Sequence, residues 1–536
     1  MSRTVYHHGV IRTMTGPDDV AEALIVQDGR IAAVGSNTAI ESEIHADDAV
    51  IDLKGQAVLP GFIDAHSHIL EQAQYFQYAD ISQARSFADI VQLLKDFARH
   101  HDIGPDSVLV GTGYDQNDLE EQRHPDAAVL DEVSTAVPIF IRHVSGHVGV
   151  ANSALLRLAG ITKDTPDPAG SRYGRIPGTQ EPNGYAEELA ALAPYYQVIE
   201  QRSPYDWPKL WKQAQDLYAS YGITTAQNGA STADDIAVLA DLAAHDAIQL
   251  DVVAYIRATE QPERIFEAYS QYDGTYSHHL KLGGWKFFLD GSPQARTAWL
   301  SKPYEGSPTY SGYAAVSDDV LTRQLKDAID HGRQTLAHCN GDAASEQYLR
   351  CYEKALHESQ YPHKDALRPV MIHCQTVRQD QLDRFAALHM IPSFFNAHTW
   401  YWGDVHVRNL GLERASHISP VRSALKRGLC YNLHRDTPIV KPDVLHSVWA
   451  AAARQTKSGR VLDEDERLTP YEALAGITSQ AAYMYGEEQS KGTLEVGKRA
   501  DLVVLDRDPA AVPTEDIRSV DVVSTIVAGV PVWHRK

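Results

Sequence analysis

The chain has 536 residues, of which 43% are hydrophobic and 22% charged, so it is long enough for two or more globular domains. Its formal net charge of −22 argues against nucleic acids and anionic membranes as partners, because both select basic surfaces. No run approaches 18 apolar residues, so we predict no transmembrane helix and no membrane partner.

The N-terminal residues and the cysteines bear on the cellular compartment. Residues 1–8 contain no apolar stretch of the kind found in a secretory signal. The four cysteines, Cys339, Cys351, Cys374 and Cys430, are sparse and form no Cys-x-x-Cys pair. This usage is typical of a reducing compartment and argues against a thiolate zinc site, so we predict a cytoplasmic location.

Both ends of the chain have β character. In residues 1–59, short apolar runs alternate with turns, and Asp28-Gly29 between two such runs is a good hairpin signal. Residues 485–536 have the same character, with a strand expected at 522–527. We predict that the two ends pair to form one small β-sandwich.

Between residues 60 and 484, strand-like and helix-like runs alternate, which is typical of βα units around a parallel sheet. We predict an α/β protein with a TIM-like (β/α)8 barrel. The eight strands are expected at residues 58–64, 223–227, 250–256, 280–289, 334–337, 370–372, 390–395 and 429–433.

This strand count requires residues 69–205 to be an insertion after the first strand. That segment contains strand-like runs of its own and a loop rich in proline and glycine. An insertion at the carboxyl end of a barrel strand lies over the active-site face. We therefore predict that residues 69–205 form a lid and substrate-binding subdomain.

The first barrel strand leads into a pair of histidines. We expect an unbroken buried strand from Gln56 to Asp64, followed by His66 and His68. Residues two apart in a strand point the same way, so the two imidazoles are predicted to face one point, as two ligands of one metal must. In a chain with 25 histidines, such a pair is nonspecific by itself.

Further polar residues lie at the ends of other predicted strands. Lys286 lies within the fourth strand, His338 ends the fifth, His373 ends the sixth, and Asp436 follows the eighth. Each strand-end histidine, taken singly, is more often a packed residue. A group of four histidines, one lysine and one aspartate at a single barrel mouth is different, because the cluster needs a cation to hold it together.

Lys286 is the most informative member of the group. It lies among aromatic residues, where an ammonium is costly unless it is paired or neutralised. Reaction with CO2 would convert the amine to an anionic carbamate that can bridge two cations. With the histidines and Asp436, it would form an open binuclear site for zinc or a similar metal.

This order of residues resembles the amidohydrolase superfamily in its binuclear type, and more closely amidohydrolase family 3, which includes N-substituted formamide deformylases and proteins described as exoenzyme regulators. The resemblance covers essentially the whole chain. Besides the ligand positions, it rests on Gly146-His147, 152–155, Asp290-Gly291-Ser292 with Arg296-Thr297-Ala298, 338–342 and 492–501. The chain departs from many relatives at Arg435, where serine or threonine commonly precedes the aspartate. That change bears on the pocket rather than on the metal.

The resemblance implies a role for each ligand. His66 and His68 would bind one metal with Asp436, and His338 and His373 would bind the other. Carboxylated Lys286 would bridge the two ions, and a hydroxide between them would attack the substrate.

The resemblance also implies catalytic roles. Asp436 would take the proton of the hydroxide and pass it to the leaving amine, so Asp436 and His373 are the expected catalytic residues at the metals. His147 is a third, as a ligand of the oxyanion or of the substrate. A hydrogen bond within the insertion is an equally supported role for His147.

An aromatic segment, residues 394–404, follows the seventh predicted strand and so should lie at the same barrel mouth. We expect His398 and Trp402 to line a pocket for an apolar or aromatic substrate group, with Arg296 and His147 as further substrate contacts. The alternative is a packed loop.

Together, these patterns predict a metal-dependent hydrolase that cleaves the C–N bond of a small amide-type substrate, such as an N-substituted formamide or N-acyl amine, with two divalent ions, zinc first among them. The alternatives are a cyclic amidine or amide deaminase, an ester or carbamate hydrolase, and a regulatory protein that kept the fold without the chemistry. Competent residues at all six ligand positions favour an enzyme. The sequence leaves the oligomeric state open, including a homo-oligomer.

Overall fold

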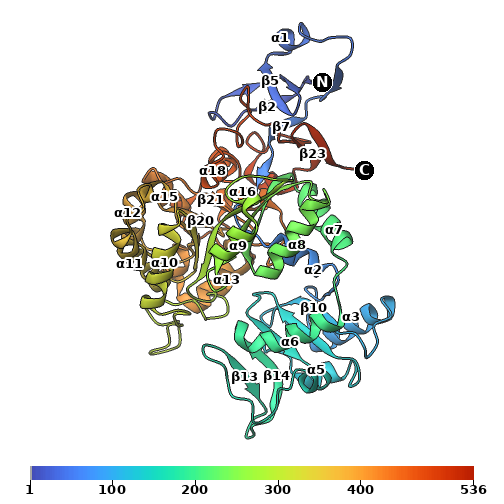
Figure 1. The fold of residues 1–536 in the computed structure, drawn as a ribbon, viewed down its shortest axis with the longest axis vertical. Helices are drawn as coiled ribbons and strands as arrows, with labels where there is room; N and C mark the ends of the chain where they lie inside the picture. Colours follow the sequence, from blue (N-terminus) through green and yellow to red (C-terminus); the bar gives the residue numbers. More distant parts are fainter. Residues whose placement is uncertain (1–2) are drawn as a thin grey trace. The chain divides into compact units, whose positions relative to one another are not determined.

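The structure is a computed structural model that describes residues 3–536, and the chain divides into two compact units. Unit 1 contains residues 3–69 and 215–536, and unit 2 contains residues 70–214. The division falls within helix α7 (Trp207–Ser220). Figure 1 colours the chain along its sequence.

The largest sheet of unit 1 has eight strands that follow one another in chain order, and every pairing within it is parallel. Its strands are β8 (Phe62–Ile63), β15 (Ile223–Ser231), β16 (Asp251–Arg257), β17 (Leu280–Phe288), β18 (Gln334–Cys339), β19 (Val370–His373), β20 (Ile391–Phe394) and β21 (Asn432–Leu433). The α/β class and the parallel order predicted from the sequence are therefore confirmed.

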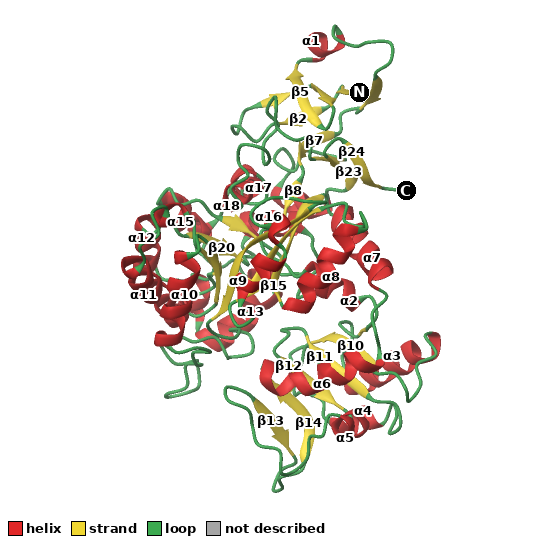
Figure 2. Ribbon diagram, in the orientation of Figure 1, coloured by secondary structure: helices red, strands yellow, loops and turns green. Residues whose placement is uncertain are grey.

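Helices connect these strands and lie around the outside of the sheet (Figure 2). The helices of unit 1 are α1 (Asn37–Glu41), α8 (Ala233–Ala244), α9 (Pro262–Ala268), α10 (Asp318–Asp330), α11 (Asp342–Glu358), α12 (Gln379–Ala387), α13 (His398–Leu410), α14 (Leu412–Ser416), α15 (Val421–Lys426), α16 (Val444–Ala453), α17 (Pro470–Ala475) and α18 (Ser479–Met484). Short 3₁₀ turns are at Ser270–Tyr272, Lys364–Ala366, Glu464–Glu466 and Thr514–Ser519. Side-chain caps mark the beginnings of several helices. At the beginning of α8, for example, Thr232 and Asp235 form a reciprocal capping box.

The first predicted barrel strand is two strands, which corrects the expectation of one unbroken strand from Gln56 to Asp64. Strand β7 (Ala57–Pro60) belongs to another sheet, and β8 begins after Gly61. The Gly61 amide donates to the carbonyl of Asp501, whereas the next amide donates to the carbonyl of Gly222. A Cβ on Gly61 would lie 2.4 Å from the side chain of Thr224, so glycine lets the chain pass closely from one sheet to the other.

Strands from both ends of the chain share one six-stranded sheet, in the order β24-β23-β22-β7-β2-β3. Its members are β2 (Val10–Arg12), β3 (Val20–Ala21), β7, β22 (Leu502–Leu505), β23 (Val522–Val527) and β24 (Val530–His534). The strand predicted at 522–527 is confirmed as β23. In Figure 1, C-terminal strands in red therefore lie beside N-terminal strands in blue.

A four-stranded sheet completes the N-terminal part, with β1 (Arg3–His7), β4 (Ala23–Gln27), β5 (Arg30–Gly35) and β6 (Ala49–Asp52). Asp28 and Gly29 both have positive φ, as a two-residue hairpin turn requires. The turn that the sequence indicated therefore lies between β4 and β5. One cluster of buried apolar side chains joins the two terminal sheets, with Tyr6 and Leu24 from the smaller sheet and Leu502 from the larger.

Unit 2 contains a six-stranded mixed sheet in the order β13-β14-β12-β11-β10-β9. Its elements are α2 (Ile69–Tyr75), β9 (Ala79–Asp80), α3 (Phe87–His100), β10 (Leu109–Tyr114), α4 (Ala127–Asp131), β11 (Ile139–His143), β12 (Val148–Ala151), α5 (Ser153–Leu158), β13 (Arg172–Arg175), β14 (Pro182–Glu187) and α6 (Leu189–Arg202). Neighbouring residues of β10, Leu109 and Val110, belong to two different apolar clusters, so both faces of this sheet are covered.

Two further expectations concern the whole chain. Within residues 3–536, we find no helix with the length and apolar character that a membrane crossing requires. All four cysteines are free thiols, and three of them are buried, consistent with a packing role.

Candidate metal centre

His66, His68 and Asp436 lie together at the carboxyl end of the parallel sheet. Asp436 Oδ1 is 3.5 Å from His66 Nε2 and 3.3 Å from His68 Nε2. Among residues 3–536, this is one of two groups whose side chains each offer a ligand atom within 4.8 Å of the others. His66 is fully buried, and His68 and Asp436 are mostly buried.

The two histidines come together through a bend, which corrects the expectation that regular strand geometry aligns them. β8 ends at Ile63, and the chain bends before His68. The His68 amide donates to the carbonyl of Thr437, and the Asp436 amide donates to the carbonyl of His66. Asp436 has a φ of 56°, a left-handed conformation that is uncommon for a residue with a side chain and recurs at functional sites.

Lys286 lies next to this group. Its Nζ atom is 3.0 Å from His66 Nε2, and the residue is only 1% exposed. Burial lowers the pKa of Lys286 to about 7. An amine with such a pKa is partly neutral near pH 7, which an exposed lysine is not.

His338 and His373 form a second pair of imidazoles at the same sheet edge. His338 Nδ1 is 3.0 Å from His373 Nε2, and both residues are buried. His338 Nε2 is 3.1 Å from the carbonyl oxygen of Gly291 and 3.1 Å from Asn340 Nδ2, which itself donates to that carbonyl. His373 has a φ of 79°, the second such backbone strain among the candidate ligands.

The donor atoms fit divalent transition metals. Two ligands bound about 2.0–2.1 Å from a tetrahedral zinc ion lie about 3.3 Å apart, and the contacts of Asp436 Oδ1 and of the His338–His373 pair measure 3.0–3.5 Å. Burial holds the pKa values of His66 and His373 well below their usual range, so both are neutral. Burial alone would raise the pKa of Asp436, but His68 and the other histidines hold it well below its usual range. Neutral imidazoles and an ionised carboxylate are the states that a metal requires.

Two buried residues that contact this group have no role in the sequence interpretation. His434 Nε2 is 3.2 Å from His373 Nδ1, and His434 Nδ1 is 2.8 Å from Ser393 Oγ. Gln227 Oε1 is 2.6 Å from His66 Nδ1. Their signal in the sequence is a polar residue within or directly after an apolar strand, which alone does not distinguish a ligand contact from a packed residue.

Asp290 fixes the turn that follows His338. Its carboxylate accepts hydrogen bonds from three backbone amides, those of Trp299 at 2.9 Å, Asn340 at 3.0 Å and Gly341 at 2.7 Å. A Cβ on Gly341 would lie 1.8 Å from the Trp299 carbonyl oxygen, so this close approach requires glycine. Asp290 therefore joins the loop after β17 to the loop after β18.

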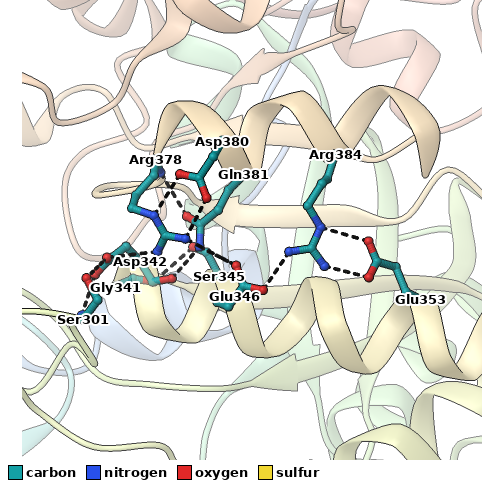
Figure 3. A network of polar contacts seen from close by, with 10 residues as sticks. All are labelled: Ser301, Gly341, Asp342, Ser345, Glu346, Glu353, Arg378, Asp380, Gln381 and Arg384. Carbon is teal, nitrogen blue, oxygen red and sulfur yellow. Dashed lines mark hydrogen bonds and ion pairs between the residues drawn. The ribbon is translucent and has the colours of Figure 1, made fainter.

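A polar network continues from this turn along helices α11 and α12 (Figure 3). Asp342 accepts from the Ser301 amide at 2.8 Å and from Arg378 at 3.2 Å. Arg384 pairs with Glu346 at 2.7 Å on the neighbouring helix. The network connects α11, which begins directly after the His338 loop, to α12.

The predicted substrate residues of unit 1 occupy two places. The His398 ring lies 4.5 Å from the ring centroids of both Trp402 and Phe395, and Phe395 lies 6.1 Å from His373. His398 and Trp402 are thus connected to the metal-binding candidates through one aromatic ring. The Arg296 guanidinium instead donates to the carbonyl of Glu305 at 2.9 Å and lies over the ring of Tyr304.

His147 belongs to unit 2. It lies between β11 and β12, and its Nδ1 atom is 3.0 Å from Glu188 Oε2. The Glu188 amide donates to the carbonyl of His147 at 2.8 Å. His147 therefore has a hydrogen-bonding partner within its own unit, and its role towards a substrate stays a prediction.

The second group of possible ligands among residues 3–536 is His7, His8 and Asp52 at the surface of the β region. His8 Nδ1 is 3.2 Å from Asp52, and His8 Nε2 is 2.9 Å from Glu41. Each nitrogen of His8 thus already faces a different carboxylate, and ordinary ion pairs account for this arrangement.

Known proteins match this chain over most of its length. The profile described as "Amidohydrolase family" matches residues 49–533. The N-substituted formamide deformylase of Arthrobacter pascens is 30% identical over 543 residues, covering 98% of this chain and 97% of the relative. The exoenzymes regulatory protein AepA of Pectobacterium carotovorum subsp. carotovorum is 25% identical, covering 72% of this chain and 83% of the relative. The crystal structure of an uncharacterized metal-dependent hydrolase from Pyrococcus horikoshii OT3 is similar with a TM-score of 0.78 and 25% identity, covering 96% of this chain and 99% of that one.

Proposed function

The chain belongs to the amidohydrolase family and is a hydrolase acting on carbon–nitrogen bonds, and from this premise we propose that it hydrolyses an N-substituted formamide or a related N-acyl amine at a binuclear metal site. The observation that carries the proposal is the convergence of His66, His68, Lys286 and Asp436, whose donor atoms approach within 3.0–3.5 Å. The formamide class is proposed because the Arthrobacter relative, which the chain matches along nearly its whole length, bears that name.

The contacts within each group support the proposed ligand sets. His66 and His68 would hold one ion together with Asp436, and His338 and His373 would hold the other. Zinc is the first candidate, because imidazole with carboxylate is a donor set that suits it. Lys286, once carboxylated by CO2, would supply carbamate oxygens as further ligands. Its near-neutral amine, 3.0 Å from His66, supports this modification, since only the unprotonated amine can attack CO2.

Two bound divalent ions would supply a water molecule of lowered pKa and a charge that polarises a carbonyl oxygen. Hydrolysis adds water across the C–N bond, with oxygen joining the carbonyl carbon while nitrogen departs. The ionised Asp436 carboxylate, beside His66 and His68, would accept a proton from the water and deliver it to the departing amine nitrogen. His373 would serve as a ligand of the second ion.

The finer architecture belongs to the same proposal. The eight parallel strands close into a (β/α)8 barrel, and the two terminal sheets pack as a sandwich made from residues 1–59 and 485–536. The inserted segment, 69–205, acts as a substrate-binding lid that contributes His147. His398, Trp402 and Arg296 complete the substrate contacts.

The test is a metal analysis followed by a substrate screen. Zinc-loaded enzyme is assayed with N-formyl amines, N-acyl amino acids, cyclic amides, ring amidines and carboxylic esters, and the product of each hydrolysis is measured. We expect turnover of at least one N-formyl amine and none by the double variant His66→Asn/His68→Asn. Turnover only of ring amidines or esters would support the alternative reactions instead, and no turnover of any substrate by the two-metal protein would support a regulatory role.

A further inference from the structure

We propose that Gln227, held by Tyr485, is a positioning residue that fixes the tautomer of His66 and so presents the lone pair of its Nε2 atom to the metal. This inference rests on the proposed metal site and adds a residue to it. Gln227 lies in β15 and is completely buried. Tyr485 follows helix α18, about 260 residues further along the chain, and its side chain enters the same buried space.

The orientation of the Gln227 amide is determined by its surroundings. One end of the amide, Nε2, lies 2.7 Å from the carbonyl oxygen of Ala65 and 2.9 Å from the hydroxyl of Tyr485. A carbonyl oxygen can only accept a hydrogen bond, so the group facing Ala65 must be the NH2. The reverse orientation would place two oxygen atoms against each other in a buried space, with no hydrogen between them.

Tyr485 adds a second constraint in the same direction. Its hydroxyl oxygen lies 3.3 Å from the carbonyl oxygen of Ala65 and 3.5 Å from that of Asp64. The hydroxyl donates its single proton to these carbonyls, and its oxygen is left to accept from Gln227 Nε2. Two independent acceptors, Ala65 and Tyr485, therefore hold the NH2 end of Gln227 away from His66.

The other end of the amide then decides the state of His66. Gln227 Oε1 lies 2.6 Å from His66 Nδ1 and can only accept, so Nδ1 must carry the hydrogen. In a neutral imidazole the remaining nitrogen, Nε2, then keeps its lone pair. That atom faces the candidate site, 3.0 Å from Lys286 Nζ and 3.5 Å from Asp436 Oδ1.

His338 is held differently. Its Nε2 lies 3.1 Å from an acceptor, the carbonyl oxygen of Gly291, and 3.1 Å from a donor, Asn340 Nδ2, so its tautomer is not fixed by a single acceptor as that of His66 is. Metal-binding histidines generally donate their second N–H to such an acceptor, and removal of that acceptor lowers metal affinity about 10- to 100-fold. At His66 the acceptor is a side chain, that of Gln227.

The decisive experiment measures zinc affinity by competition with a chelator, in the full-length protein. Gln227→Met keeps the size of the side chain but has neither acceptor nor donor, and we expect about 10- to 100-fold weaker binding. Gln227→Glu retains an acceptor oxygen for His66 but turns its second oxygen towards the carbonyl of Ala65, and we expect it to recover only part of the affinity that the methionine variant loses.

The matched control is Gln347→Met. Gln347 is also a buried glutamine of unit 1, with its Nε2 donating to the carbonyl of Val316 at 2.7 Å, but it contacts no candidate ligand. We expect its zinc affinity to stay within about twofold of the wild type, because second-shell effects require contact with a ligand. Equal zinc affinity in Gln227→Met and the wild type would overturn the inference, and so would an equal loss in both methionine variants. A wild type that binds no metal would instead overturn the proposed function on which the inference rests.

A second measurement does not depend on the folding of any Gln227 variant. The ¹⁵N shifts of the histidine rings in the metal-free wild type report which nitrogen is protonated, and His66→Asn identifies the signals of His66. We expect hydrogen on Nδ1 of His66. Hydrogen on Nε2 in the metal-free protein would overturn the inference.

Discussion

The loss of the Asp290 carboxylate should destabilise unit 1 strongly. Asp290→Ala leaves the backbone amides of Trp299, Asn340 and Gly341 without their acceptor. A buried donor without a partner costs about 1–3 kcal/mol, so three such donors cost roughly 3–6 kcal/mol once entering water satisfies some of them. Asp290→Asn keeps one acceptor oxygen and should lose about half as much.

Urea denaturation followed by tryptophan fluorescence measures this effect as a lowered free energy of unfolding. Glu22→Ala is the control, because Glu22 also accepts a backbone hydrogen bond, from Asn37 at 2.9 Å, but is exposed. A solvated hydrogen bond contributes about 1 kcal/mol, so the control should lose no more than that. Equal losses in Asp290→Ala and Glu22→Ala would refute the role of Asp290 as a buried anchor.

Three further predictions concern other parts of the molecule. Lys286→Ala should lose most bound metal and nearly all turnover, and short carboxylic acids should restore part of both, whereas Lys286→Arg should not be rescued; metal analysis and initial rates measure this. His147→Ala should reduce kcat/KM for the substrate found in the screen, and unchanged turnover would remove His147 from the site. Burial alone would raise the pKa of Asp251, but Lys491 and Arg499 hold it well below its usual range. Its ionised form therefore stabilises the fold above about pH 4 and loses that effect as the pH falls further. The stability difference between the wild type and Asp251→Asn should shrink from pH 7 to pH 3 in urea titrations, and a constant difference would contradict this.

The parallel sheet was predictable because each of its strands and connecting helices has a local sequence pattern, and alternating strands and helices favour parallel pairing. Apolar runs such as Val370–His373 are short and separated by helical periodicity, and a hairpin signal such as Asp28-Gly29 depends on the φ angles of two residues alone. The break at Gly61 was not predictable in this way. The apolar run continues through it, and only pairing with distant strands assigns its two halves to different sheets.

The candidate site likewise contains residues that the sequence could predict and one that it could not. His66, His68, Lys286 and Asp436 could be proposed from their positions at strand ends, since the carboxyl ends of parallel strands meet at one edge. Gln227 could not, because its role depends on a hydrogen bond to a residue about 160 positions earlier in the chain. A single sequence contains no local pattern that records such a contact.

The central claim is that two metal ions bind, one of them at His338 and His373. Counting the zinc ions bound per chain, after loading and removal of excess metal, tests it most directly. The account predicts two ions in the wild type and one in the double variant His338→Ala/His373→Ala, which keeps His66, His68 and Asp436. One ion in both proteins would contradict the account and indicate a single-metal site instead.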